Sequence, residues 1–302
     1  MKKILVVGSL NMDSVVETPS MPKAGETISG RSVTLIPGGK GANQAYAAGK
    51  LGGNVGMIGA VGADSFGEAL KSNLEKVHVD TTGVEIMEGE TTGQAFITVD
   101  DNGENSIIII AGTNGLVSKE LIERNRRLVE ESDIVVMQLE IPLDVVEYVK
   151  DLAVSLGKQV ILDPAPAVPG LPDSFWKGID YIKPNETELA ILTGRERKTD
   201  AELAEGAREM IAKGVKRVIV TLGSEGCMYV TANTEKHFPA KKVKAVDTTA
   251  AGDSFTAGFA LALSMDRSVE EAICLGQKVS AIAVTRKGAQ TSVPAMEEIE
   301  AG

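Results

Sequence analysis

The stretch Lys3-Ile4-Leu5-Val6-Val7-Gly8-Ser9-Leu10-Asn11-Met12-Asp13 begins with an apolar run, which ends at a glycine and is followed by polar residues. A short β-branched run of this kind predicts a buried strand, and it is too short for a signal peptide or a membrane span. Asn11 and Asp13 then follow that strand directly. The stretch therefore predicts a strand that leads into polar residues able to hold a ligand.

The same unit recurs along the chain, because short apolar runs alternate with longer segments of helical periodicity. The predicted strands are residues 3–8, 55–60, 134–138, 159–163, 181–183 and 217–222. The predicted helices are residues 42–51, 65–76, 119–131, 143–156, 200–213, 252–264 and 269–286. This alternation predicts an α/β fold, with a Rossmann-like, mainly parallel sheet that is flanked by helices on both faces. Such a sheet binds ligands beyond the carboxyl ends of its strands.

Two segments break the alternation, residues 14–36 and residues 91–111. In the second, the strand-like runs 94–99 and 105–110 flank Asp101-Asn102-Gly103, a turn signal that predicts a hairpin. We expect these two insertions to form a small β-sheet lid over an α/β domain made of residues 1–13, 37–90 and 112–302. The alternative is that they extend an edge of the main sheet.

The composition excludes several classes of function. The 302 residues include 31 Lys and Arg against 42 Asp and Glu, so the net charge of −11 disfavours a general nucleic-acid binder. No apolar stretch approaches the roughly 18 residues of a membrane span. Two isolated cysteines, Cys227 and Cys274, favour a reducing compartment, and we expect a cytoplasmic protein.

Histidine is scarce, since His78 and His237 are the only two and each lies in a polar surrounding. We expect both on the surface. This count excludes a site with several histidine ligands and disfavours a Ser-His-Asp triad. A general base in this protein is therefore expected to be a carboxylate.

The segment Asp247-Thr248-Thr249-Ala250-Ala251-Gly252-Asp253 lies between strand-like residues 241–246 and a helix of small and apolar residues. A small-residue loop that opens a helix offers free backbone N–H groups to an anion, which indicates a phosphate site. Asp253 would repel a phosphate there unless it had another task, such as taking a proton from an attacking hydroxyl. The alternative is that it only complements the helix dipole.

A second glycine loop, Pro37-Gly38-Gly39-Lys40-Gly41-Ala42-Asn43-Gln44, also enters a helix. It fits neither the P-loop nor the dinucleotide G-x-G-x-x-G pattern, although Lys40 and Asn43 could hold a polar ligand. Alternatively, it is a structural turn. Asn11 and Asp13 lie two residues apart, so both side chains can point to one side and grip sugar hydroxyls, or else they stabilise a turn.

Two further loops follow predicted strands. In Asn185-Glu186-Thr187-Glu188, a helix cap is compatible with a carboxylate that binds water around Mg²⁺. Thr221-Leu222-Gly223-Ser224-Glu225-Gly226 suits a nucleotide phosphate or a plain hairpin equally well.

Together these loops resemble the ribokinase, or PfkB, family of sugar and nucleoside kinases. Both family signatures are present, at residues 38–45 and 247–259, and the resemblance runs from Ile4 to about Pro294. The resemblance implies ATP-dependent phosphorylation of the 5-hydroxyl of D-ribose to give D-ribose 5-phosphate and ADP. It also implies a homodimer that forms through the β lid.

The resemblance assigns roles to individual residues. It implies that Asp253 is the general base and that the amides of Ala250, Ala251 and Gly252 form an anion hole. The sugar positions it implies are Asn11, Met12, Asp13, Gly39, Lys40, Gly41, Ala42, Asn43, Glu140 and Asp253. The ATP positions are Asn185, Thr221, Leu222, Gly223, Ser224, Glu225, Gly226, Gly252 and Gln277. Gln277 stands where family members often carry Asn near the adenine.

The resemblance also implies two metal sites. Glu188 would hold Mg²⁺ through water. A monovalent cation, usually K⁺, would be held mostly by backbone carbonyls at Asp247, Thr249, Ala283, Arg286, Gly288 and Ser292.

Three other functions remain open from the sequence. One is a kinase of the same family for another pentose, a deoxypentose or a nucleoside. Another is a sugar or nucleotide sensor that has kept the fold and lost the chemistry. A dinucleotide oxidoreductase is disfavoured, because no G-x-G-x-x-G follows the first strand.

Overall fold

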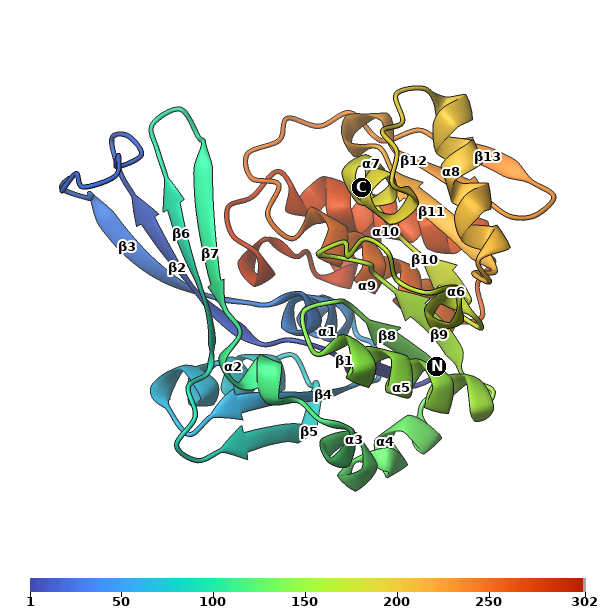
Figure 1. The fold of residues 1–302 in the computed structure, drawn as a ribbon, viewed down its shortest axis with the longest axis horizontal. Coiled ribbons are helices and arrows are strands. Elements are labelled where there is room, and N and C mark those ends of the chain that lie inside the picture. Colours follow the sequence, from blue (N-terminus) through green and yellow to red (C-terminus); the bar gives the residue numbers. More distant parts are fainter. Residues whose placement is uncertain (301–302) are drawn as a thin grey trace.

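The computed structural model describes residues 1–300, which form two separate β-sheets (Figure 1). The main sheet has nine strands in the order β13-β12-β11-β10-β9-β8-β1-β4-β5. These strands are β1 (Ile4–Val7), β4 (Val55–Gly62), β5 (Asp80–Met87), β8 (Ile134–Met137), β9 (Gln159–Leu162), β10 (Tyr181–Ile182), β11 (Arg217–Thr221), β12 (Cys227–Val230) and β13 (Glu235–Phe238). All neighbours pair in parallel except β11–β12 and β12–β13. The predicted mainly parallel sheet is confirmed.

Helices cover both faces of this sheet, because its central strands are apolar on both sides. In β1, Leu5 and Val7 pack into one core, whereas Ile4 and Val6 pack into the other. The first core is closed by α3 (Lys119–Arg124), α4 (Arg126–Glu131), α5 (Leu143–Ser155), α6 (Asp173–Trp176), α7 (Glu186–Thr193) and α8 (Asp200–Ala212). The second is closed by α1 (Lys40–Lys50), α2 (Ser65–Glu75), α9 (Ala251–Ser264) and α10 (Val269–Ala283). The short α11 (Met296–Glu300) packs against α9 and α10 through Ile299.

The smaller sheet has the order β3-β2-β6-β7 and projects from the body in Figure 1. Its strands are β2 (Asn11–Glu17), β3 (Ser32–Gly38), β6 (Gly93–Val99) and β7 (Asn105–Ile110). The predicted hairpin is confirmed, since β6 and β7 pair antiparallel and Gly103 takes a φ of 79° in the turn. The alternative of an edge extension is wrong. Because β2 begins at Asn11, this residue and Asp13 lie on the lid sheet, and the division into domains at residues 13 and 14 stays a prediction.

Two predicted elements are wrong. The single helix expected over 119–131 is broken at Asn125, whose side-chain amide donates to the carbonyl of Leu121 at 3.0 Å and competes with the helical ladder. Residues 241–246 form no strand: they are exposed and irregular. Pro239 stands just after β13 and has no N–H to donate, which helps to explain why pairing stops at Phe238.

Other expectations about the surface hold. His78 and His237 are both exposed, as predicted. No helix within residues 1–300 is long and apolar enough to cross a membrane.

Small residues bring α1 close to its neighbours. A side chain at Gly41 would place its Cβ 2.6 Å from the backbone nitrogen of Ser9, and α1 also packs against the Ala-rich α9. The glycine loop at the start of α1 is therefore required for packing, and this packing sets the amino ends of α1 and α9 side by side.

Candidate active site

The carboxyl ends of β8, β9 and β10 and the amino ends of α1 and α9 converge at one edge of the main sheet. Side chains from all five elements contact one another there, at Gln138, Asp163, Lys183, Gln44 and Asp253. This is the edge at which an open α/β sheet binds its ligands.

Asp253 is the centre of this cluster. It lies in the first turn of α9 and is only 5% exposed. Its Oδ2 accepts a hydrogen bond from Asn43 Nδ2 at 3.0 Å, and its Oδ1 accepts one from Gln44 Nε2 at 2.9 Å. The hydrogen bonds from Asn43 and Gln44 replace solvent around this buried carboxylate, which lies at the positive end of the α9 dipole.

The start of α9 has an unusual backbone. Ala250 is the N-cap residue, takes a left-handed φ of 58°, and offers no side-chain cap. The first N–H groups of a helix have no partner within it, and here the Ala251 N–H donates to the carbonyl of Thr248 at 3.2 Å. The half-buried amides of Ala250 and Gly252 remain at the positive end of the helix dipole.

Lys183 adds a buried positive charge beside this helix start. Its Nζ lies 3.3 Å from Asp163 Oδ1, and both side chains are almost fully buried. The same Nζ would lie 3.2 Å from a Cβ at Gly252. The ammonium and the helix dipole therefore act together on any anion at Gly252.

The strand β2 carries a second group of polar side chains. Asn11 is buried, and its Oδ1 accepts from Asn114 Nδ2 at 2.7 Å. Asn114 is itself fixed by the backbone of Leu10, to which it donates and from which it accepts. This contact orients the Asn11 amide with its oxygen towards Asn114.

Asp13 is a half-buried carboxylate on the same strand. Burial raises the pKa of Asp13 to about 7, and the negative charges of Glu140 and Asp253 act in the same direction. Gly38 pairs with Asn11 on the neighbouring strand β3, and a Cβ on Gly38 would come within 2.2 Å of Asp13 Oδ2. The missing side chain at Gly38 thus leaves room for the carboxylate.

Lys40 and Glu140 lie at the start of α1. Glu140 Oε2 accepts from the Lys40 N–H at 3.0 Å and from Ser9 Oγ at 2.5 Å, so it caps this helix, where Gly39 provides no side-chain cap. Burial raises the pKa of Glu140. Burial acts to lower the pKa of Lys40, but four surrounding carboxylates outweigh it and raise that pKa. They belong to Asp253, Asp163, Glu140 and Glu188.

The remaining residues of the predicted sugar set contribute differently. Met12 and Ala42 have side chains buried in the core, so they can offer a ligand only backbone atoms. Gly39 takes a φ of 84°, which allows the chain to turn into α1.

The expected nucleotide and Mg²⁺ loops lie next to each other. Asn185 forms a bridge with Thr221, at the end of β11. Asn185 and Glu188 form a reciprocal capping box on α7, and burial raises the pKa of Glu188. Residues 221–226 lead by a short 3-10 turn into β12, so this loop is a hairpin whose exposed Ser224 remains accessible to a nucleotide.

Gln277 lies on α10, and its side chain contacts Cys227 at the start of β12. Its Nε2 donates to the carbonyl of Phe238 at 2.8 Å, so its amide is tied to the end of β13.

The expected K⁺ segments are joined by Asp247. Its Oδ1 accepts from the Thr249 N–H at 2.9 Å and its Oδ2 from the Gly288 N–H at 2.8 Å. Burial acts to raise the pKa of Asp247, but these hydrogen bonds outweigh it and the pKa is lowered. Two neighbouring groups already have partners, since the Ala283 carbonyl accepts from the Arg286 N–H and Ser292 Oγ donates to the Ala289 carbonyl.

Sequence reasoning missed several residues of the cluster: Gln44, Asn114, Gln138, Asp163 and Lys183. Gln138, Asp163 and Lys183 end predicted strands, so the rule that singled out Asn11 could have found them. The other two gain their roles from contacts with distant segments.

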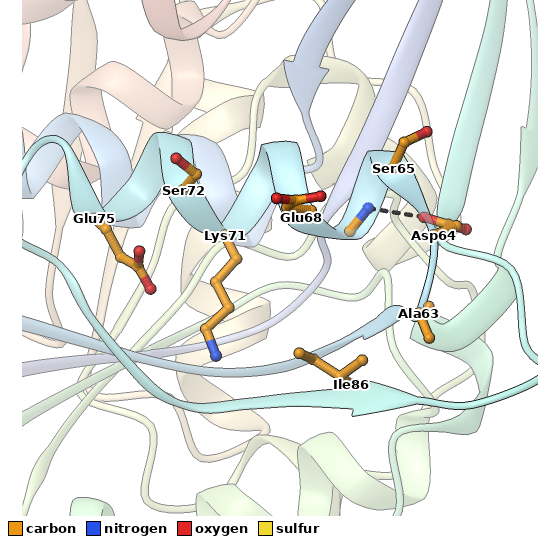
Figure 2. Close-up of a pocket in the computed structure, with 10 residues that line it drawn as sticks. Ala63, Asp64, Ser65, Glu68, Lys71, Ser72, Glu75 and Ile86 are labelled. Carbon is orange, nitrogen blue, oxygen red and sulfur yellow. Dashed lines mark hydrogen bonds between the residues drawn. The ribbon is translucent and has the colours of Figure 1, made fainter.

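A surface cavity of about 630 Å³ lies elsewhere, between α2 and β5 (Figure 2). Figure 2 shows Asp64, Glu68, Lys71 and Ile86 around it, and the dashed line marks the cap that Asp64 provides to the Gly67 N–H. None of the predicted site residues lines this cavity.

Known proteins are similar to this chain over nearly its whole length. A model of the pfkB family of carbohydrate kinases matches residues 1–296. A ribokinase of Haemophilus influenzae is 41% identical over 297 residues, which cover 98% of this chain and 97% of that protein. A deoxyribokinase of Salmonella typhi is 40% identical over 295 residues, which cover 98% and 96% respectively. The structure of Arabidopsis thaliana ribokinase complexed with ribose and ATP aligns with a TM-score of 0.92 at 33% identity, over 99% of this chain and 98% of that chain.

The fold and these similarities define an ATP-dependent carbohydrate kinase. The chain belongs to the pfkB family of carbohydrate kinases.

The raised pKa of Asp13 predicts a pH dependence of sugar use. An ionised carboxylate accepts hydrogen bonds from sugar hydroxyls, and Asp13 becomes protonated as the pH falls through about 7. We expect kcat/KM for the sugar to fall up to about tenfold per pH unit below that point. In Asp13→Asn this limb should vanish and kcat/KM should be low throughout.

The exposed Glu88 provides the control, because Glu88→Gln should keep the wild-type profile. A wild-type profile that is flat from about pH 6 to 8 would contradict this assignment.

Proposed function

We propose that this protein is a ribokinase, which transfers the γ-phosphoryl group of ATP to the 5-hydroxyl of D-ribose and yields D-ribose 5-phosphate and ADP. The observation that carries the proposal is the position of Asp253. A buried carboxylate held by Asn43 and Gln44 stands beside the open amides of α9 and interacts electrostatically with Asp13 on the lid strand.

In the proposed reaction, each group of the site has one role. Asp253 accepts the proton of the 5-hydroxyl as the oxygen attacks phosphorus, and ADP leaves from the opposite side. The amides of Ala250, Ala251 and Gly252 stabilise the charge on the transferring phosphoryl oxygens. The Ala251 N–H would have to exchange its bond to Thr248 for the phosphoryl group. Lys40 and Lys183 would contribute positive charge nearby.

Asn11, Asp13, Lys40, Asn43 and Glu140 would hold the sugar, with Met12, Gly39, Gly41 and Ala42 providing backbone around it. Asn11 donates and Asp13 accepts, which suits a pair of sugar hydroxyls. ATP would bind along Asn185, the 221–226 loop, Gly252 and Gln277.

Mg²⁺ would be held by ATP phosphates and through water by Glu188. Mg²⁺ keeps most of its waters and takes few protein carboxylates, and the half-buried Glu188 fits this donor set. When bound, the ion would neutralise charge on the phosphates.

A deoxypentose kinase is the second candidate, because the Salmonella typhi deoxyribokinase is nearly as similar as the Haemophilus influenzae ribokinase. The polar pair Asn11 and Asp13 favours ribose. A site built to hydrogen-bond a hydroxyl discriminates strongly against a substrate that lacks it, because its buried polar groups are then left unpaired.

A substrate panel with coupled ADP detection tests the proposal. D-ribose, 2-deoxy-D-ribose, other pentoses and a nucleoside are compared by initial rates with Mg²⁺ and K⁺ present. We expect the highest kcat/KM for D-ribose, at least about tenfold above 2-deoxy-D-ribose. A preference for 2-deoxy-D-ribose would support the second candidate, and no ATP consumption with any acceptor would make the protein a sensor.

We also propose K⁺ activation through Asp247, Thr249, Ala283, Arg286, Gly288 and Ser292, most of which would offer backbone carbonyls. Asp247 supports this by joining the two segments. In the same assay, exchange of K⁺ for Na⁺ at constant ionic strength should lower the rate, and equal rates would remove the claim.

Asp253→Asn tests the base directly. Loss of the proton acceptor should lower kcat at least ~100-fold, while sugar affinity changes much less. Asp266→Asn is the matched control, because Asp266 is an exposed carboxylate just beyond the same helix. Near-normal turnover in Asp253→Asn would place the base elsewhere.

Two copies of the chain are proposed to associate through the lid. Large apolar side chains are exposed on its strands: Val33, Leu35, Phe96, Ile107, Ile108, Ile109 and Ile110. Consecutive residues of a strand point to opposite faces of a sheet, so Ile107 to Ile110 expose apolar surface on both faces of the lid. Exposed apolar surface of this kind commonly marks an interface. Light scattering should give twice the chain mass of 31.7 kDa, and Ile108→Lys should shift the protein towards the monomer. A monomeric wild type would contradict the dimer.

A further inference from the structure

Gln44 is a buried amide whose orientation is determined by its neighbours. Its side chain is 1% exposed, and its Oε1 accepts from Gln138 Nε2 at 2.7 Å. Its Nε2 donates to Asp253 Oδ1 and to Asp163 Oδ2, each at 2.9 Å. The reverse orientation would place an amide oxygen against two carboxylates, so the contacts themselves assign which atom is nitrogen.

The amide therefore separates two like charges. It uses one N–H group for each carboxylate, and Asp163 is in turn anchored by Lys183, with 3.3 Å between Nζ and Oδ1. These groups form a continuous buried chain from Lys183 through Asp163 and Gln44 to Asp253. Without the amide, two carboxylates in the same buried region would be left without the donor they share, which is costly.

Asn43 holds the other oxygen of Asp253 from the next position of the same helix. The Asn43 oxygen accepts from Gln290 Nε2 at 3.1 Å, and Gln290 accepts from Asn73 at 2.6 Å. Both oxygens of Asp253 thus accept hydrogen bonds from two consecutive residues, Asn43 and Gln44, and each of these amides is held by a further hydrogen bond of its own. Rotation of the carboxylate would break at least one of its two hydrogen bonds.

We propose that Gln44 is a positioning residue for the reaction: it holds the Asp253 carboxylate oriented towards the acceptor hydroxyl, and Asp163 with Lys183 anchors it. The inference rests on the proposed function, in which Asp253 accepts the proton. Gln44 itself touches neither the sugar nor the phosphoryl group in this account.

The first test compares kcat with KM in Gln44→Met, which keeps the volume and removes both donors. The other charged groups that act on this region are Asp13, Lys40 and Glu140, and all are kept. A misoriented base slows the reaction without weakening sugar binding, so we expect kcat to fall by about ten- to a hundredfold. The KM for the sugar should change less than about threefold.

Ser132→Ala is the control. It removes a buried hydrogen bond, which the Ser132 hydroxyl donates to the Val129 carbonyl at 2.8 Å outside the cluster, so it should lower thermal stability and leave kcat and KM in place. A merely structural role for Gln44 predicts that Gln44→Met behaves like this control.

Gln44→Glu is the second variant, in case the methionine variant does not fold. It is isosteric, keeps an acceptor for Gln138, and places a negative charge beside Asp253, so kcat should fall at least as far. A folded variant of either kind with the wild-type kcat would overturn the inference. Failure of the proposed function itself is distinguishable, because the wild type would then consume no ATP with ribose.

Discussion

The site depends on burying one carboxylate at the start of a helix. Removing an ionised group from water is costly unless hydrogen bonds replace the solvent, and Asp253 is only 5% exposed. The amides of Asn43 and Gln44 provide those bonds, which requires the amino end of α1 to approach α9 closely. Gly41 lets the start of α1 pack closely on the chain between β1 and β2, since a Cβ there would meet the backbone of Ser9. The glycine loop therefore serves the packing that places Asn43 and Gln44 within hydrogen-bond distance of Asp253.

The site contains positively charged side chains although the chain as a whole is acidic. The chain carries a net charge of −11, yet the buried Lys183 and the half-buried Lys40 lie among the carboxylates of the site. Asp163 and Glu140 offset these cations in the absence of substrate, while the dipole of α9 adds positive potential at Gly252. A polyphosphate would meet few side-chain cations and many backbone N–H groups, so an acidic protein can bind one at this single edge.

Sequence patterns predicted the parts of the fold that are local. Buried parallel strands such as β1 and β8 are continuous apolar runs. The turn residues Asp101-Asn102-Gly103 predicted the hairpin of β6 and β7. The strands β5, β12 and β13 were missed, and β5 and β13 mix polar and apolar residues. Residues 241–246 combine three lysines with Val243, Ala245 and Val246, and they have no partner strand. Within the site, Asp253 was predictable from its own loop. Gln44 was not, because it meets Asp163 and Asp253 across 119 and 209 positions of sequence.

The most direct measurement is a crystal structure with D-ribose and a non-hydrolysable ATP analogue. We expect the 5-hydroxyl of D-ribose to lie within about 3 Å of an Asp253 oxygen. Gln44 should still donate its hydrogen bond to that carboxylate, and the γ-phosphate should lie at the amides of residues 250–252. A sugar bound away from Asn11 and Asp13, or an Asp253 turned away from the hydroxyl in the ternary complex, would contradict it.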